Sequence, residues 1–79
     1  MTEQFKKYIY DLLMEIRGGN QEIKESDSLK DDVGVDSLTM VSLIISIENH
    51  FGIEFEDSDL SFENLETVGS LLAMLEKYL

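Results

Sequence analysis

The sequence contains no cysteine and no proline, and it has few residues of positive charge. Without cysteine the chain can form no disulfide, no thiolate metal site and no thiol nucleophile of its own, a composition that fits a cytoplasmic protein. No apolar run approaches the ~20 residues that a membrane span needs, and the first twenty residues lack the apolar segment of a signal peptide. We therefore expect no membrane association.

Basic residues number six, against seventeen acidic ones, and the formal net charge is −11. Such a surface repels nucleic-acid phosphates and anionic lipids, so nucleic acid is not an expected partner. Protein partners with basic patches are favoured. The alternative is that the charge only keeps a small domain in solution.

The chain of 79 residues is long enough for one domain, residues 1–79, which we expect to be monomeric. It has no Gly/Ser-rich linker and no internal repeat. A core of this size supplies only ~3–5 kcal/mol of net stability, which disfavours a deep enzymatic cleft.

Apolar residues recur at helical spacing in three stretches. The first runs from Phe5 to Ile16, with Thr2 as N-cap and Gly18-Gly19 as the stop, and the second runs from Leu38 to Phe51. The third follows a cap at Thr67 and continues through Tyr78 and Leu79. With one short helix between Ser58 and Leu65 and no strand, the predicted fold class is all-α, a small four-helix bundle.

Residues 20–35 are polar and acidic, with isolated apolar residues at Ile23, Leu29, Val33 and Val35. This spacing fits neither a helix nor a strand. We expect a long loop held to the core by those four side chains, and loops of this length are uncommon in compact domains unless they are functional.

The second helix has apolar residues over an arc of roughly 220°, which is wider than one buried stripe needs. The middle of that arc, the expected core face, consists of Met40, Leu43, Ile44, Ile47 and Phe51. Leu38, Val41 and Ile45 lie along its far edge. Either the bundle buries this helix from several sides, or the far edge is a docking strip that stays exposed.

Catalytic and metal sites are not supported by the residues present. The one histidine, His50, lies on the same predicted helix as Ser37 and ~20 Å from it, so the two cannot form a catalytic pair. Asp57 and Asp59 resemble the start of a calcium loop, but Phe62 and Val68 stand where that loop needs glycine and glutamate. We predict no enzyme and no metal site, and interpret the acids of residues 54–66 as a solvated face.

Ser37 lies where the acidic segment meets the apolar second helix. It can be an ordinary N-cap, since Asp36-Ser37 favours a helix start. Its hydroxyl can instead accept a phosphodiester-linked group, because a helix N-terminus stabilises a phosphate.

Nearly the whole chain resembles an acyl carrier protein. The similarity lies in SLKDDVGVDSL at residues 28–38, IENHFGIEF at 47–55 and TVGSL at 67–71. This resemblance implies that Ser37 receives 4′-phosphopantetheine from coenzyme A through a Mg²⁺-dependent phosphopantetheinyl transferase, which recognises Asp36. The arm's thiol would then hold an acyl group as a thioester and supply the sulfur that the chain lacks.

The resemblance also implies that Leu38, Val41, Ile45 and Glu48 dock acyl-loading, condensing and tailoring enzymes. Type II fatty-acid carriers usually place acids just after the serine, where this chain has Thr39 and Ser42. The chain therefore looks closer to carriers of polyketide or nonribosomal peptide synthesis. Alternatives are a fatty-acid carrier, a peptidyl or aminoacyl carrier, and a helical interaction module without a prosthetic group.

Overall fold

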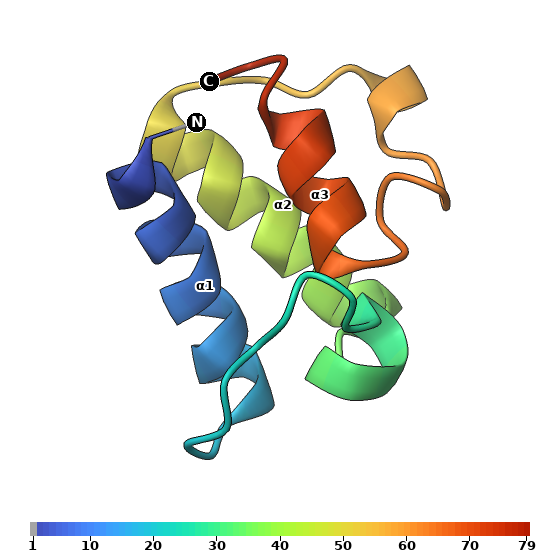
Figure 1. The fold of residues 1–79 in the computed structure, drawn as a ribbon. Coiled ribbons are helices and arrows are strands. Elements are labelled where there is room, and N and C mark those ends of the chain that lie inside the picture. Colours follow the sequence, from blue (N-terminus) through green and yellow to red (C-terminus); the bar gives the residue numbers. More distant parts are fainter. Residues whose placement is uncertain (1) are drawn as a thin grey trace.

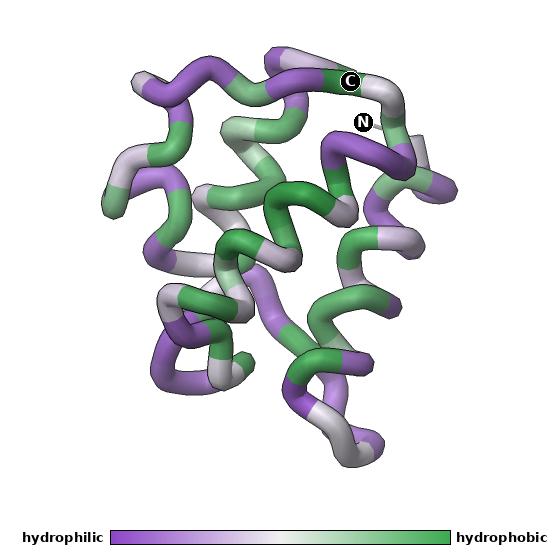
Figure 2. The backbone as a smooth tube through the Cα atoms, turned by 180° about the vertical axis from the view of Figure 1, so that it is seen from behind, coloured by the Kyte–Doolittle hydropathy of each residue, from purple (hydrophilic) through white to green (hydrophobic). Residues whose placement is uncertain are grey.

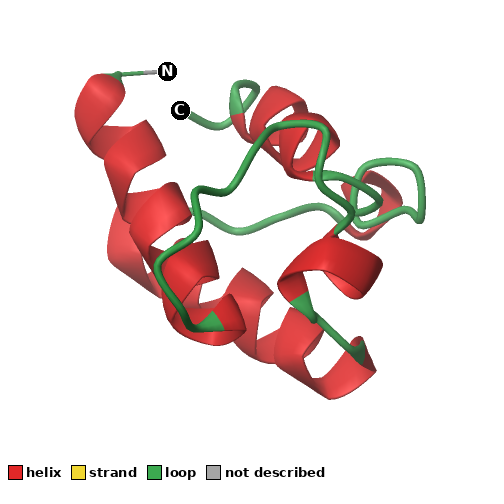
Figure 3. Ribbon diagram, turned by 60° about the horizontal axis from the view of Figure 1, so that its bottom comes forward, coloured by secondary structure: helices red, strands yellow, loops and turns green. Residues whose placement is uncertain are grey.

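A computed structural model describes residues 2–79, which form three α-helices linked by long irregular connections (Figures 1 and 3). The predicted all-α class is confirmed. No helix within residues 2–79 has the length and apolar character to cross a membrane. The α-helices and two short helical segments are α1 Glu3–Arg17, η1 Leu29–Val33, α2 Ser37–Phe51, η2 Asp57–Asp59 and α3 Val68–Leu75.

The predicted helix starts at Thr2 and Thr67 are confirmed by their hydrogen bonds. The Thr2 hydroxyl accepts the N–H of Phe5 at 3.3 Å. Thr67 and Ser70 form a reciprocal capping box, in which each side-chain oxygen accepts the other residue's N–H at 3.0 Å. At the end of α2, Gly52 adopts the left-handed conformation, with φ of 66°, that glycine takes without steric cost.

The core is built from all three α-helices and from both connections between them, and Figure 2 shows the apolar residues concentrated along the helices. The four anchors predicted in residues 20–35 are each 3% exposed or less, as expected. The fully buried large side chains are Ile9, Leu13, Leu29, Leu43, Ile47, Leu71, Leu75, Val33 and Val68.

The expectation of a continuous loop over residues 20–35 is wrong at Leu29–Val33, which forms a single wide helical turn. Side chains rather than apolar spacing create this turn. The Ser28 hydroxyl accepts the N–H of Asp31 at 3.0 Å, and the Asp32 carboxylate accepts the N–H of Ser28 at 2.7 Å. Five residues are too few to show a helical period, so the sequence pattern does not reveal the turn.

The predicted short helix between Ser58 and Leu65 is also wrong in its position. The structure has one 3₁₀ turn, Asp57–Asp59, and residues 62–65 form a hydrogen-bonded turn instead of a helix.

The last predicted helix ends earlier than expected, at Leu75, so Tyr78 and Leu79 lie beyond α3. The Tyr78 hydroxyl donates a hydrogen bond to the Asp59 carboxylate and accepts one from the N–H of Glu56. Lys77 also donates to Asp59, and these two partners hold the pKa of the Asp59 carboxyl below its usual value. These hydrogen bonds hold the last residues of the chain against the η2 segment, where they are no longer helical.

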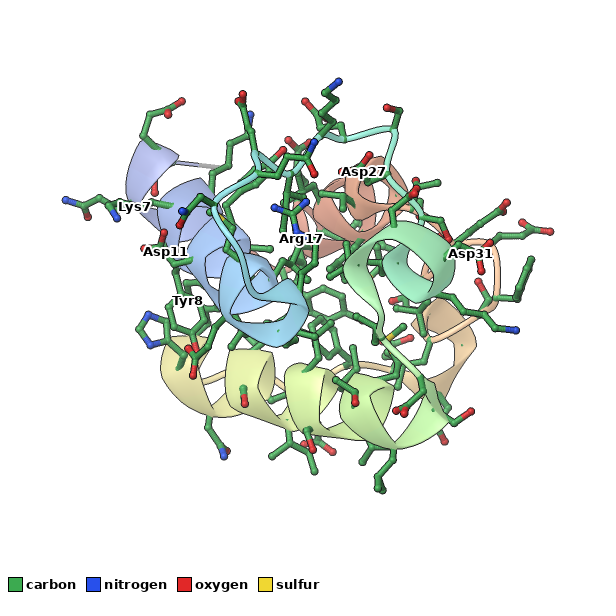
Figure 4. The ribbon with its side chains drawn as sticks, turned by 90° about the horizontal axis from the view of Figure 1, so that it is seen from below. Lys7, Tyr8, Asp11, Arg17, Asp27 and Asp31 are labelled. Atoms are coloured by element: carbon green, nitrogen blue, oxygen red, sulfur yellow. The ribbon has the colours of Figure 1, made fainter. Side chains whose placement is uncertain are left out.

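The start of α1 and the last residues of the chain lie at the end of the molecule where α2 finishes (Figure 1). The Phe5 and Phe51 rings are 4.9 Å apart, and those of Phe55 and Tyr78 are 5.0 Å apart. His50 is exposed, as expected near a helix end, and its ring stacks on Tyr8, which points from α1 toward the end of α2 in Figure 4. Ser37 begins α2 at the opposite end.

Candidate cofactor-attachment site

Ser37 is the first residue of α2, and the N-cap is Asp36. The Asp36 carboxylate accepts the N–H of Thr39 at 2.8 Å, and its backbone carbonyl accepts the N–H of Met40 at 2.8 Å. The interpretation of Ser37 as an N-cap is therefore wrong, because the extended backbone that a cap requires occurs one residue earlier. The exposed Ser37 hydroxyl is not used to start the helix.

Asp36 is an exposed, charged neighbour of that hydroxyl. The hydrogen bond from the N–H of Thr39 is the main cause that lowers the pKa of the Asp36 carboxyl. A negative side chain at a helix N-terminus is also favoured by the helix dipole. At neutral pH the chain thus presents a carboxylate directly beside the Ser37 hydroxyl.

This lowered pKa predicts an acid sensitivity. A carboxyl whose pKa is lower in the folded than in the unfolded state stabilises the fold above the unfolded pKa, and that stabilisation is lost as the pH falls through the folded pKa. In Asp36→Asn the amide can still cap the helix but does not titrate. Urea midpoints measured by circular dichroism between about pH 5 and pH 2 should therefore fall less for Asp36→Asn than for wild type.

Glu54→Gln is the matched control for that experiment, since it removes one exposed negative charge away from the cap. As the pH falls, the urea midpoint of Glu54→Gln should decline nearly as much as that of wild type. The midpoint of Asp36→Asn should decline less than either. Parallel declines for wild type and Asp36→Asn would contradict the assignment of the cap to Asp36.

A surface hollow of about 460 Å³ lies beside Ser37. Apolar side chains make up most of its wall, and Lys30 is the one basic residue in it. The hollow is lined by Lys30, Val35, Asp36, Ser37, Met40, Leu60, Phe62 and Leu65.

A second hollow of about 270 Å³ continues along α2 and has an entirely apolar wall. It shares Met40, Leu60 and Leu65 with the hollow at Ser37, so the two form one apolar groove between α2 and residues 60–65. Its remaining lining residues are Val41, Ile44 and Ile45.

The far edge of α2 is exposed, which answers the question that the wide apolar arc left open. Leu38 is 79% exposed, Val41 55% and Ile45 49%. On the predicted core face, Leu43, Ile44 and Ile47 are buried, and Met40 and Phe51 are partly buried. The structure therefore exposes the apolar edge that the sequence offered as a docking strip.

Phe62 was missed in the sequence, where it stands among the acids of residues 54–66. It is 79% exposed and joins the wall of the hollow at Ser37. Of the four large hydrophobic side chains that are exposed within residues 2–79, Val41, Ile45 and Phe62 thus line this groove. An aromatic residue in an acidic segment was its only sequence signal, and the buried Phe55 shares that signal.

Glu48 differs from the other predicted docking residues. It is half-buried, and its carboxylate accepts the N–H of Phe55 at 2.9 Å. Eleven residues of helix place it about 16 Å from Ser37 along α2. The single acidic side chain of α2 is therefore occupied in holding the segment that follows the helix.

The family model for the phosphopantetheine attachment site matches residues 7–75 of this chain. An acyl carrier protein of Chlorobium phaeobacteroides is 37% identical over 79 residues, which cover 98% of this chain and 99% of the relative. The chain belongs to the acyl carrier protein family. It is a carrier rather than an enzyme, and its cofactor is a covalently attached 4′-phosphopantetheine.

Other carriers extend the comparison. The acyl carrier protein of Exiguobacterium sibiricum is 37% identical over 94% of this carrier and 92% of the relative. A solved acyl carrier structure from Mycobacterium tuberculosis, 27% identical, matches with a TM-score of 0.80 over 95% of this carrier and 99% of that chain. A chain in the complex of Bradyrhizobium japonicum glycine:[carrier protein] ligase with glycylated carrier protein has the same fold, with a TM-score of 0.78 at 23% identity over 91% of this carrier and 99% of that chain.

The residues around Ser37 fit a phosphopantetheine group. The hydroxyl is exposed, the first turn of a fifteen-residue helix favours a phosphate, and an apolar hollow adjoins the position. When bound, the group supplies a flexible arm that ends in a thiol.

Proposed function

We propose that Ser37 is the attachment point and that the carrier holds acyl intermediates there as thioesters and presents them to partner enzymes. The observation that carries this proposal is that two neighbouring residues have separate roles at the start of α2. Asp36 caps the helix, so the adjacent hydroxyl of Ser37 is exposed for modification beside the apolar groove.

Attachment is a phosphoryl transfer in which the Ser37 oxygen forms a bond to a phosphorus atom of coenzyme A. The pyrophosphate bond breaks, the nucleotide bisphosphate leaves, and the hydroxyl gives up its proton. One carboxylate oxygen of Asp36 accepts a hydrogen bond from the N–H of Thr39, and the other can contact the Mg²⁺ that the transferase uses. The partner transferase supplies the catalytic groups.

The exposed edge of α2 supports a docking role for Leu38, Val41 and Ile45. The helix offers partners little charge, because Thr39 and Ser42 stand where fatty-acid carriers usually have acids. Its one acidic side chain, Glu48, is hydrogen-bonded within the protein. Charges at the rim of an interface mainly set association rate and partner choice. We infer that loading, condensing and tailoring enzymes of polyketide or related specialised biosynthesis dock through apolar contact.

The test is incubation with coenzyme A, Mg²⁺ and a broad-specificity phosphopantetheinyl transferase, followed by intact mass and peptide mapping. Wild type should gain one phosphopantetheinyl group on the peptide that contains Ser37. Ser42→Ala, which removes another exposed hydroxyl of α2, should gain the same mass.

Wild type that stays unmodified with several transferases would refute the proposal and favour the interaction module without a prosthetic group. The intact mass of the protein from its native host separates the alternatives for the cargo. A fatty-acyl, an aminoacyl or a polyketide-type group each adds a different mass to the arm.

A further inference from the structure

We propose that Lys30 forms an ion pair with the phosphodiester that links the arm to Ser37, and so holds the base of the arm toward η1. This inference rests on the proposed attachment of the arm to Ser37. It gives a role to the wide turn Leu29–Val33, which the sequence pattern did not reveal.

Lys30 lies beside the attachment position. It lines the hollow of about 460 Å³ at Ser37 and is the one basic residue in its wall. Its side chain is exposed, and within residues 2–79 it takes part in no ion pair, since the ion pairs of this part of the chain use other lysines. The Lys30 ammonium group is therefore available to a new anion at Ser37.

The backbone that carries Lys30 is firmly held. The N–H of Leu29 donates to the carbonyl of Glu66 at 3.0 Å, and the Leu29 side chain is fully buried. The Leu29 carbonyl accepts the N–H of Val35 at 2.7 Å, which fixes the turn against the residues that lead into α2. Because the turn is already ordered, an ion pair at Lys30 restricts little more than the lysine side chain.

The other charges close to Ser37 in the sequence are negative. Asp36 precedes it and is ionised at neutral pH, and Asp31 and Asp32 follow Lys30. A phosphodiester adds one more negative charge, which these carboxylates repel. Lysine binds phosphate as a compact charge with three N–H donors, so Lys30 supplies the attraction that the carboxylates oppose.

The overall charge makes this contact measurable. The chain has a formal net charge of −11, and a further negative charge adds to the self-repulsion that destabilises a compact fold. A base beside the phosphate offsets that effect. Removal of the charge at Lys30 should therefore make attachment of the arm more costly to the stability of the fold.

The test compares the urea unfolding of the unmodified protein and of the protein with the arm, for wild type and for Lys30→Gln. The quantity measured is the ratio of the folding equilibrium constant with the arm to that without it. At low salt this ratio should be roughly two- to fivefold larger in wild type, the range of an exposed ion pair. At about 1 M NaCl, where the screening length is about 3 Å, the ratios of the two proteins should converge.

Phosphorus NMR gives a second, local measurement, because the protein with its arm holds one phosphorus atom. At low salt the chemical shift of this signal should differ between wild type and Lys30→Gln. Lys24→Gln is the matched control, since it removes the same charge from an exposed lysine outside the hollow, and it should leave both the shift and the ratio at wild-type values. Lys30→Arg keeps the charge and should restore the ratio.

The outcomes separate this inference from the proposed function. Wild type that takes up no arm would overturn both together. If the proteins load normally, equal ratios in wild type and Lys30→Gln, or an unchanged phosphorus signal in Lys30→Gln, would overturn only the role of Lys30. An equal loss in Lys24→Gln would do the same, because it would assign the effect to net charge alone.

Discussion

Replacing Ser37 with alanine is expected to abolish phosphopantetheine attachment without lowering the stability of the fold. The hydroxyl is the acceptor of the arm in the proposed function, so its removal should reduce the mass gain from complete to zero. The cap is supplied by Asp36, and Ser37 is an exposed residue inside the first turn of α2. Alanine is the better helix former there, by up to about 0.7 kcal/mol.

Two measurements on the same samples check this expectation: intact mass after treatment with transferase, and a urea midpoint by circular dichroism. Asp36→Ala is the matched comparison, because it removes the cap and should lower the midpoint. A clear loss of stability in Ser37→Ala would show that its hydroxyl helps to start the helix. A full mass gain in Ser37→Ala would place the arm elsewhere.

Truncation of Ile47 to alanine is expected to remove a large part of the total stability. Ile47 is fully buried in the second half of α2, and loss of such a side chain costs about 2–5 kcal/mol. A core of this size supplies only about 3–5 kcal/mol of net stability. Ile47→Ala should therefore unfold at a much lower urea concentration, with the slope of the transition little changed.

Ile45→Ala makes the same chemical change two residues earlier on the same helix. Ile45 is 49% exposed, so its truncation should cost under about 1 kcal/mol. For binding to loading or condensing enzymes the order of the two variants should be reversed. Ile45→Ala should weaken this binding more than Ile47→Ala does. Equal losses of stability in the two variants would mean that the far edge of α2 is buried in solution.

The three long helices could be predicted because their signals are local. Thr2 and Thr67 are good caps in front of apolar residues at helical spacing, and Gly18 and Gly52 supply stops. The buried anchors of residues 20–35 followed from their isolation among polar residues. The sequence showed that the apolar arc of α2 is wider than one core face needs. Only the structure showed that the far edge of this arc is exposed.

The errors arose where contacts distant in the sequence decide the conformation. The end of α3 at Leu75 depends on bonds between Tyr78 and residues 56 and 59, which no periodicity encodes. At the start of α2, Asp36 and Ser37 are equally good caps by residue type, and only the backbone geometry selects Asp36. Phe62 was overlooked because its importance comes from the hollow that it borders.

The position of Leu79 at the end of the molecule where α2 finishes has a practical consequence. Fourteen helical steps separate Ser37 from Phe51, which is about 21 Å. A label joined to Leu79, such as a fluorophore, an affinity handle or a surface linker, would therefore lie at the opposite end of the molecule from the Ser37 hydroxyl. The protein can be immobilised through that end and still offer Ser37 and the exposed edge of α2 to enzymes in solution.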